Sequence, residues 1–273
     1  MLKILVCVKQ VPDMAEIRMD PETGAMIRDG VLMMLNPHDA HAVSAAVKMK
    51  EEYGAEVTLI TMGPPTAEEM LRGCLAVGCD KAILLTDYAF ANADTLATSY
   101  SIFAAAETVD KYDLIFCGKE SVDGATGQMG AQLAERFGAA QVTSALLIHR
   151  VDEQAKTAVV ERKLEDGTEM LEVRLPCLCA VEKPHYPARV PNLKGKMAAK
   201  KAQITVLTAG DIPGLDRNRI GDCGSPTKVS RMFFPVMPES GLILDEGTAS
   251  ATVDKLLGLL AADGVLQEVR DDG

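Results

Sequence analysis

The segment Cys117-Gly118-Lys119-Glu120-Ser121-Val122-Asp123-Gly124-Ala125-Thr126-Gly127-Gln128 separates a short apolar run from an amphipathic stretch. The run before it, Asp113–Phe116, is short and branched enough to be a buried strand. Apolar residues after it recur at spacings of three and four, as on one face of a helix: Met129, Leu133, Ala134 and Phe137. A glycine-rich turn before a helix offers free backbone N–H groups that suit a phosphate. Turn geometry alone also explains the glycines, so both interpretations stay open.

Strands and helices are expected to alternate over the first 140 residues. The expected strands are Lys3–Lys9, Glu56–Met62, Lys81–Leu85 and Asp113–Cys117. The first has apolar side chains on both faces, which is typical of a covered, parallel strand. The pattern predicts an α/β fold with a doubly wound, mostly parallel sheet.

The helix that follows the first strand is expected to begin at Asn36-Pro37. Asparagine can cap free N–H groups, and proline is favoured at the first helical position. Asp39 places a negative charge in the first turn. The buried face is expected to consist of Ala42, Val43, Ala46 and Met49. Later helices are predicted around Met70–Leu75 and from Asp94-Thr95 onward.

The second half of the chain has a different pattern. Three antiparallel strands are expected at Val142–Val151, Thr157–Leu164 and Met170–Leu175, and Pro176–Val181 returns to the main sheet. A small hairpin is expected from Glu16–Asp20 and Met26–Arg28. The predicted domains are residues 1–183, which bind nucleotide, and residues 184–273, an extended arm with a final helix that needs a surface to pack on.

Composition excludes several classes of function. A formal net charge of −11 disfavours general nucleic-acid binding. No apolar run reaches the roughly 18 residues of a membrane span, and a cytoplasmic location is expected. The basic patch Lys194–Lys201 fits either an acidic partner or a solvated surface. Most cysteines lie in apolar runs, as expected of buried thiols in a reducing compartment: Cys7, Cys74, Cys79, Cys117, Cys177, Cys179 and Cys223. We expect no metal site and no catalytic side chain.

Three strand ends are expected to form one composite site. Ligands of doubly wound sheets lie outside the carboxyl ends of the strands. This rule brings together Cys7-Val8-Lys9, Met62-Gly63 and Gly118–Gln128. The sequence contains neither the G-x-G-x-x-G fingerprint nor the P-loop motif, so the kind of nucleotide stays open at this point.

Several motifs, spread over nearly the whole chain, resemble the beta subunit of electron-transfer flavoprotein. They are Ile4–Asp13, Asn36–Asp39 with Ala42, Met62–Pro64, Gly118–Gln128, and the signature-like stretch Val160-Glu161-Arg162 through Glu165-Asp166-Gly167, Glu169, Leu171 and Pro176. Cys179 departs from that signature, where an aliphatic residue is usual. This change affects side-chain packing more than it affects the resemblance to the family.

The resemblance implies a Rossmann-like, nucleotide-binding α/β domain and a set of residues that bind an adenine nucleotide. By motif match these are Cys7, Val8, Lys9, Asn36, Pro37, His38, Asp39, Met62, Gly63, Gly118, Lys119, Glu120, Ser121, Val122, Asp123, Gly124, Ala125, Thr126, Gly127, Gln128 and Met129, with Ser225 and Thr227 added from the tail. Some family members hold structural AMP here. Others hold FAD that accepts hydride from NADH and divides the electrons. Lys9–Asp13 and Gly224–Val229 are more similar to the second, bifurcating kind.

The resemblance also implies partners. An alpha subunit carries a second flavin and forms a heterodimer with the beta subunit, and the residue 184–273 arm is expected to pack on it. A flavin-dependent dehydrogenase, such as an acyl-CoA dehydrogenase, is expected to dock at Val190 and Pro191. Ferredoxin is the implied low-potential acceptor.

Two other classes of function remain open. A non-redox nucleotide-binding module leaves the stretch Val160–Pro176 and the long tail unexplained. A nucleotide hydrolase or transferase needs a metal or nucleophile arrangement that the sequence does not reveal. A yellow complex with a flavin spectrum would exclude both.

Overall fold

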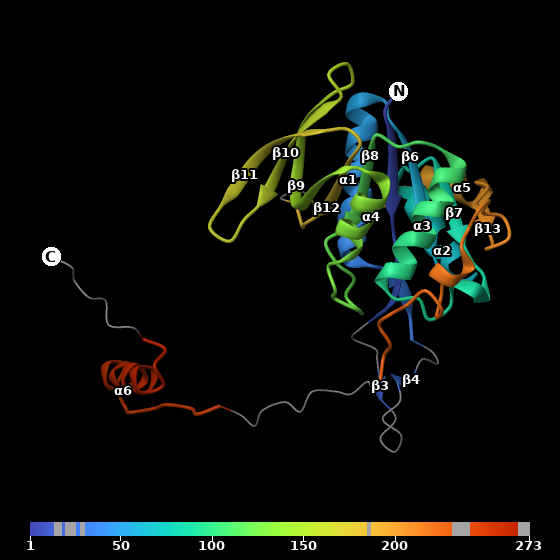
Figure 1. The fold of residues 1–273 in the computed structure, drawn as a ribbon. Coiled ribbons are helices and arrows are strands. Elements are labelled where there is room, and N and C mark those ends of the chain that lie inside the picture. Colours follow the sequence, from blue (N-terminus) through green and yellow to red (C-terminus); the bar gives the residue numbers. More distant parts are fainter. Residues whose placement is uncertain (14–17, 20–25, 28–30, 185–186, 231–240, 267–273) are drawn as a thin grey trace. The chain divides into compact units, whose positions relative to one another are not determined.

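The computed structural model describes residues 1–13, 18–19, 26–27, 31–184, 187–230 and 241–266. By its contacts the chain divides into two units, Met1–Met232 and Phe233–Gly273. Within the described residues, the first unit contains a nine-stranded sheet with the order β11-β10-β9-β12-β8-β1-β6-β7-β13 (Figure 1).

The centre of this sheet is parallel, as predicted. Its strands are β1 (Lys3–Cys7), β6 (Glu56–Met62), β7 (Lys81–Leu85), β8 (Leu114–Gly118) and β12 (Cys177–Val181). Each pairs in parallel with its neighbour. Nearly all their side chains are buried because helices cover both faces, so the strands read as continuous apolar runs.

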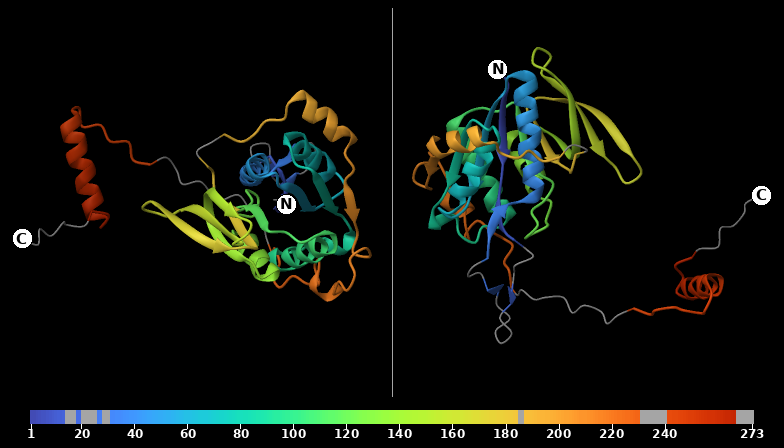
Figure 2. Two further views of the ribbon diagram at one scale, coloured as in Figure 1. Left: turned by 90° about the horizontal axis from the view of Figure 1, so that it is seen from above. Right: turned by 180° about the vertical axis from the view of Figure 1, so that it is seen from behind.

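Two layers of helices cover the sheet. On one face, Ile4, Val6 and Val8 share a core with α1 (Pro37–Tyr53), α2 (Ala67–Val77) and α5 (Leu193–Lys201). On the other face, Leu5 and Cys7 pack with α3 (Thr95–Val109) and α4 (Met129–Phe137). Figure 2 shows α1 in front when the sheet is seen from behind, whereas α3 and α4 lie in front in Figure 1. The predicted buried face of α1 is confirmed.

The strand order reverses between β1 and β8. From β1 the chain moves to β6 and β7 on one side, then crosses back to β8 on the other side of β1. The connections that leave the carboxyl ends of β1 and β8 therefore diverge. A crevice at such a reversal is where ligands of doubly wound sheets bind.

An antiparallel extension continues the sheet beyond β12. It consists of β9 (Ala140–Asp152), β10 (Thr157–Lys163) and β11 (Thr168–Arg174), which confirms the three predicted strands. β9 is parallel to β12 and antiparallel to β10. The turn at residues 164–167 is closed by the Leu164 amide, which donates to the Gly167 carbonyl at 2.8 Å.

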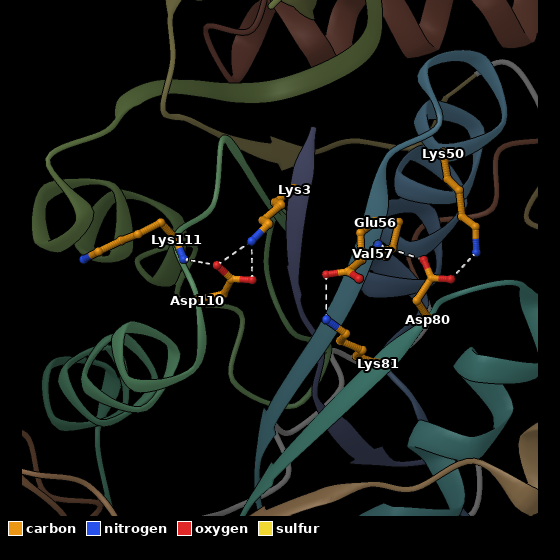
Figure 3. Close-up of polar contacts among 8 residues, drawn as sticks. All are labelled: Lys3, Lys50, Glu56, Val57, Asp80, Lys81, Asp110 and Lys111. Carbon is orange, nitrogen blue, oxygen red and sulfur yellow. Dashed lines mark hydrogen bonds and ion pairs between the residues drawn. The ribbon is translucent and has the colours of Figure 1, made fainter. Parts of the chain in front are cut away.

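Ion pairs occupy the amino-terminal edge of the parallel strands, opposite the predicted site (Figure 3). Lys3 pairs with Asp110 at 2.6 Å, and Lys81 pairs with Glu56 at 2.7 Å. Asp80 accepts the Val57 amide at 3.0 Å and pairs with Lys50 at 2.5 Å. These contacts join the starts of the strands, at the edge of the sheet opposite the carboxyl ends of the strands.

The first unit extends further along the chain than the expected boundary at residue 183. Helix α5 packs on α2, and β13 (Thr205–Leu207) adds to the sheet in parallel with β7. Neither element had been predicted, and both lie within the first unit. The final helix, α6 (Ala249–Ala262), is confirmed and lies in the second unit, where no described residue of it is buried.

Short elements complete the described structure. β2 (Gln10–Pro12) pairs antiparallel with β5 (Met33–Leu35), and two 3-10 turns lie at Tyr88–Phe90 and Arg217–Arg219. Of the predicted small hairpin, β3 (Arg18–Met19) pairs antiparallel with β4 (Met26–Ile27), and the rest lies outside the described residues. Within the described residues, none of the helices is both long and apolar enough to cross a membrane.

Candidate functional site

The carboxylate of Asp39 joins the ends of the two strands at the reversal. Asp39 lies in the first turn of α1 and is 5% exposed. It accepts the Lys9 amide, beyond β1, at 2.8 Å and the Gly118 amide, at the end of β8, at 2.9 Å. Burial raises the pKa of this carboxyl from 3.8 to about 7, although the two amide hydrogen bonds lower it.

Asn36 makes a different contact from the one that the sequence predicted. We expected its side chain to cap α1, but it makes no capping hydrogen bond. Instead its Nδ2 donates to the Glu120 carbonyl at 2.9 Å, and its Oδ1 accepts the Val122 amide at 3.2 Å. The asparagine therefore binds the backbone of a loop more than 80 residues away in sequence.

Gly118 has no room for a side chain. A Cβ there would lie 2.6 Å from Asp39 Oδ1 and 2.7 Å from the His38 carbonyl carbon. Atoms at these distances clash, and the second belongs to the backbone. The glycine lets the start of the loop approach the first turn of α1 closely.

The loop between β8 and α4 presents backbone amides. Gly127 has φ 63° and Ala125 has φ 47°, both in the left-handed region. Within the described structure the amides of Gly124, Thr126 and Gly127 have no hydrogen-bond partner. No described side chain caps the N-terminus of α4, so its first amides are also available. Such a loop can bind an anion.

Charged side chains surround this loop. Lys9 Nζ pairs with both carboxylate oxygens of Asp123 at 2.7 Å. Burial raises the pKa of Asp123, but the hydrogen bonds from Lys9 and Ser121 together with the charge of Lys9 outweigh it, so the pKa is lowered. Lys119 pairs with Glu182 at 3.1 Å. His38 Nε2 lies 3.9 Å from Glu120 Oε1. Lys9 and Lys119 thus place two ammonium groups beside acidic residues in or next to the loop.

Met62 and Gly63 lie at the carboxyl end of β6, next to β1. The Gly63 amide donates to the Leu85 carbonyl at 3.0 Å, which joins the ends of β6 and β7. These residues therefore share the edge of the sheet that holds Lys9 and the loop. Cys7 and Val8 are buried in that edge, on opposite faces.

Ser225 and Thr227 hold the tail against the start of α3. Ser225 is 4% exposed, accepts the Asp94 amide at 2.8 Å and donates to the Gly221 carbonyl at 2.6 Å. The Thr227 amide donates to Asp94 Oδ2 at 3.0 Å. Since the Ser225 hydroxyl already donates to the Gly221 carbonyl, its contacts in the structure anchor the tail.

A polar cluster next to the loop had not been singled out from the sequence. The hydroxyl of Thr95 donates to Gln128 Oε1 at 2.7 Å, and Gln132 Nε2 donates to Thr95 at 3.3 Å. Gln132 Oε1 is buried without a hydrogen-bond partner among the described residues. The sequence had pointed to Gln128 as part of the loop and to Thr95 as a helix start, but nothing in it had singled out Gln132 or the contact between them.

The thiols near the site are not reactive nucleophiles. Burial raises the pKa of Cys7 well above its usual value and that of Cys117 to about 12. Thiolates, not thiols, attack and bind metals. No group of three potential metal ligands occurs among the residues that the structure describes.

Val190 lies apart from the loop, before α5. Its side chain is 85% exposed, whereas its neighbour Arg189 is anchored through an amide hydrogen bond to Ser44 at 3.0 Å and an ion pair with Glu51. Asn192 caps α5 by accepting the Gly195 amide at 2.8 Å. The segment thus presents an apolar side chain between two fixed points.

Comparison with known proteins supports this description of the chain. The family model described as "Electron transfer flavoprotein domain" matches residues 23–212. The caffeyl-CoA reductase-Etf complex subunit CarD of Acetobacterium woodii is 44% identical, over 96% of this chain and 97% of that one. An electron transfer flavoprotein subunit beta of Thermoanaerobacterium thermosaccharolyticum is 41% identical, over 97% and 100%. Protein FixA of Azorhizobium caulinodans is 38% identical, over 94% and 92%.

Proposed function

The chain belongs to the electron transfer flavoprotein family as a beta subunit, and we propose that its strand-end site binds FAD and takes part in electron transfer from NADH. The loop Gly118–Gln128 carries this proposal. It lies at the reversal in strand order. Among the residues that the structure describes, several of its amides are unpaired and no side chain caps the α4 N-terminus into which it leads. These features suit the phosphates of an adenine nucleotide.

The residues present fit such a group. The loop amides and the N-terminus of α4 would receive the phosphates, and Lys9 and Lys119 would balance part of their charge. Met62 and Gly63 lie on the adjacent strand end, next to β1. Gly124 leaves room for a phosphate to approach its backbone, because a Cβ built at this position would meet no atom nearer than 3.4 Å.

The chain supplies binding and placement. Bound FAD would supply the redox chemistry, namely acceptance of a hydride from NADH and division of the electron pair between the alpha-subunit flavin and a low-potential acceptor such as ferredoxin. The buried, protonated thiols of Cys7 and Cys117 leave the surroundings of the strand ends uncharged at these positions. No side-chain nucleophile is needed.

The partners follow from the same assignment. We expect an alpha subunit that completes the heterodimer and contacts the 184–273 segment, and a flavin-dependent dehydrogenase that docks at Val190 and Pro191. The relative from Acetobacterium belongs to a complex with a CoA-ester reductase, which is compatible with an acyl-CoA dehydrogenase as partner. Six buried free thiols suit a reducing, cytoplasmic compartment.

Nucleotide extraction tests the proposal. The heterodimer of this chain with its alpha subunit should release FAD from both subunits and no AMP. Gly118→Ala should release only the alpha-subunit flavin, because its Cβ would clash at the base of the loop. Gly73→Ala, which has no neighbour within 4 Å, should retain both. Equal amounts of FAD and AMP would instead identify a non-bifurcating protein with structural AMP.

A further inference from the structure

The first turn of α1 contacts the loop at several backbone positions. Asn36 binds the Glu120 carbonyl and the Val122 amide, and Asp39 binds the Gly118 amide. Asp39 also binds the Lys9 amide at the end of β1. Two short side chains from one helical turn therefore hold both segments that leave the strand reversal.

Both side chains are enclosed by the chain itself. Asn36 is 1% exposed and Asp39 is 5% exposed. The amide group of Asn36 uses both its oxygen and its nitrogen, and each carboxylate oxygen of Asp39 accepts one amide. Little surface or hydrogen-bonding capacity is left for a ligand.

The Asp39 carboxylate links β1 and β8 beyond the last residues that pair directly. The β1–β8 pairing runs from Ile4 with Leu114 to Val6 with Phe116. Beyond that register the amides of Lys9 and Gly118 both bond to the carboxylate. The side chain therefore bridges the two strands where they part, at the mouth of the crevice where a ligand of this fold binds.

We propose that Asn36 and Asp39 are positioning residues, which hold the loop Gly118–Gln128 in the shape that receives phosphates without contacting the nucleotide themselves. The proposal rests on the proposed function, since it concerns the same site. It differs from the expectation that both residues bind the cofactor directly.

The physical basis is preorganisation. A loop of this length loses conformational entropy when it becomes ordered around a ligand, which weakens the binding free energy. The loss on binding is smaller when the loop is already ordered in the free protein. The four hydrogen bonds fix backbone atoms at both sides of the reversal before any ligand arrives. Leaving the buried Gly118 amide or the partly buried Glu120 carbonyl unpaired is costly.

Three variants of the full chain test the proposal. Asp39→Asn keeps the shape of the side chain but turns an NH₂ group toward one amide donor. Asn36→Ala removes the contacts to Glu120 and Val122. Asp80→Asn is the matched control, because Asp80 also accepts a strand amide, that of Val57, but at the opposite edge of the same sheet (Figure 3).

Two measurements are compared in each variant. Hydrogen exchange of the nucleotide-free chain, resolved by residue with NMR, reports whether the loop is held. Titration with FAD and with AMP reports affinity. We expect faster exchange at Lys9 and Gly118 in Asp39→Asn and at Val122 in Asn36→Ala, with affinity reduced about tenfold or more in both. Asp80→Asn should speed exchange at Val57 and leave the affinity unchanged.

Direct contact predicts a different result. If either side chain binds the nucleotide itself, affinity falls while loop exchange in the free protein stays as in the wild type, and the positioning role is overturned. Equal losses of affinity in the Asp80 control would also overturn it, because the effect would then be general destabilisation. If the wild type binds neither nucleotide, the proposed function fails. Independently of binding, unchanged exchange at Gly118 in Asp39→Asn and at Val122 in Asn36→Ala would refute the positioning role.

Discussion

The ammonium of Lys9 lies 2.7 Å from both carboxylate oxygens of Asp123, and so joins the end of β1 to the loop that follows β8. The Lys9 side chain is 48% exposed, and solvent therefore screens the pair. Such an exposed ion pair contributes about 0–1 kcal/mol to folding. Its position beside the loop amides points to a role in binding charge.

Opposite effects on affinity are expected when the two partners are changed. Lys9→Met should weaken FAD or AMP binding about three- to tenfold, because a cation near the phosphates is lost. Asp123→Asn should leave affinity equal or higher, since it removes a negative charge and frees the ammonium. Titration calorimetry in low salt measures both. Weaker binding in both variants would show that the ion pair itself shapes the loop.

Gly118 should tolerate no side chain. In Gly118→Ala the new Cβ would lie 2.6 Å from Asp39 Oδ1, so the first turn of α1 or the loop must shift. We expect a loss of about 1–3 kcal/mol in unfolding free energy. Gly73→Ala, in the interior of α2, should instead gain about 0.5–1 kcal/mol. Urea denaturation of both variants checks the contrast, which a neutral Gly118→Ala would contradict.

Stability should depend on pH through Asp39. Its folded pKa is raised from 3.8 to about 7, so the folded state holds this proton more tightly than the unfolded state. Its contribution is present in full below about pH 4 and is lost as pH rises to about 7, at no more than about 1.4 kcal/mol per pH unit. Unfolding free energies measured across this range should show a falling component that is absent from Asp39→Asn. Identical pH profiles would contradict the buried titration.

Docking of the dehydrogenase should depend on Val190. This side chain is 85% exposed, so Val190→Asp should change the unfolding free energy by no more than about 0.5 kcal/mol. Electron transfer to the dehydrogenase should be lost while the flavin content stays constant. Tyr88→Asp, at a side chain that is 96% exposed elsewhere on the unit, serves as the control. Normal transfer with Val190→Asp would remove this docking site.

Much of the fold could be predicted from periodicity. The bounds of β6 and β7 were predicted to the residue, because both are apolar runs ended by turn residues. Helix α5 was missed because it is basic, contains Gly195 and buries only Ala199 among its described residues. Its position depends on distant contacts instead, such as the Arg72 guanidinium donating to the Ala199 carbonyl at 2.7 Å.

The convergence of the strand ends could be predicted from the sequence, but the contacts among the residues there could not. The strand-end rule correctly gathered Lys9, Gly63 and Gly118 at one edge. The role of Asn36 was misjudged because local sequence predicts a helix cap, whereas its partners Glu120 and Val122 are brought near only by the sheet topology. Ser225 likewise contacts Asp94 across 131 residues, and no local pattern reveals that hydrogen bond.

Anaerobic titration with NADH tests the central claim most directly, because it counts the redox-active flavins in the heterodimer. If this chain holds FAD in the site around Gly118–Gln128, the flavin absorbance should bleach with two equivalents of NADH per heterodimer. Gly118→Ala should lower the flavin content to the one carried by the alpha subunit. Flavin and AMP in equal amounts, with no more than one equivalent of NADH consumed by the wild type, would contradict the account.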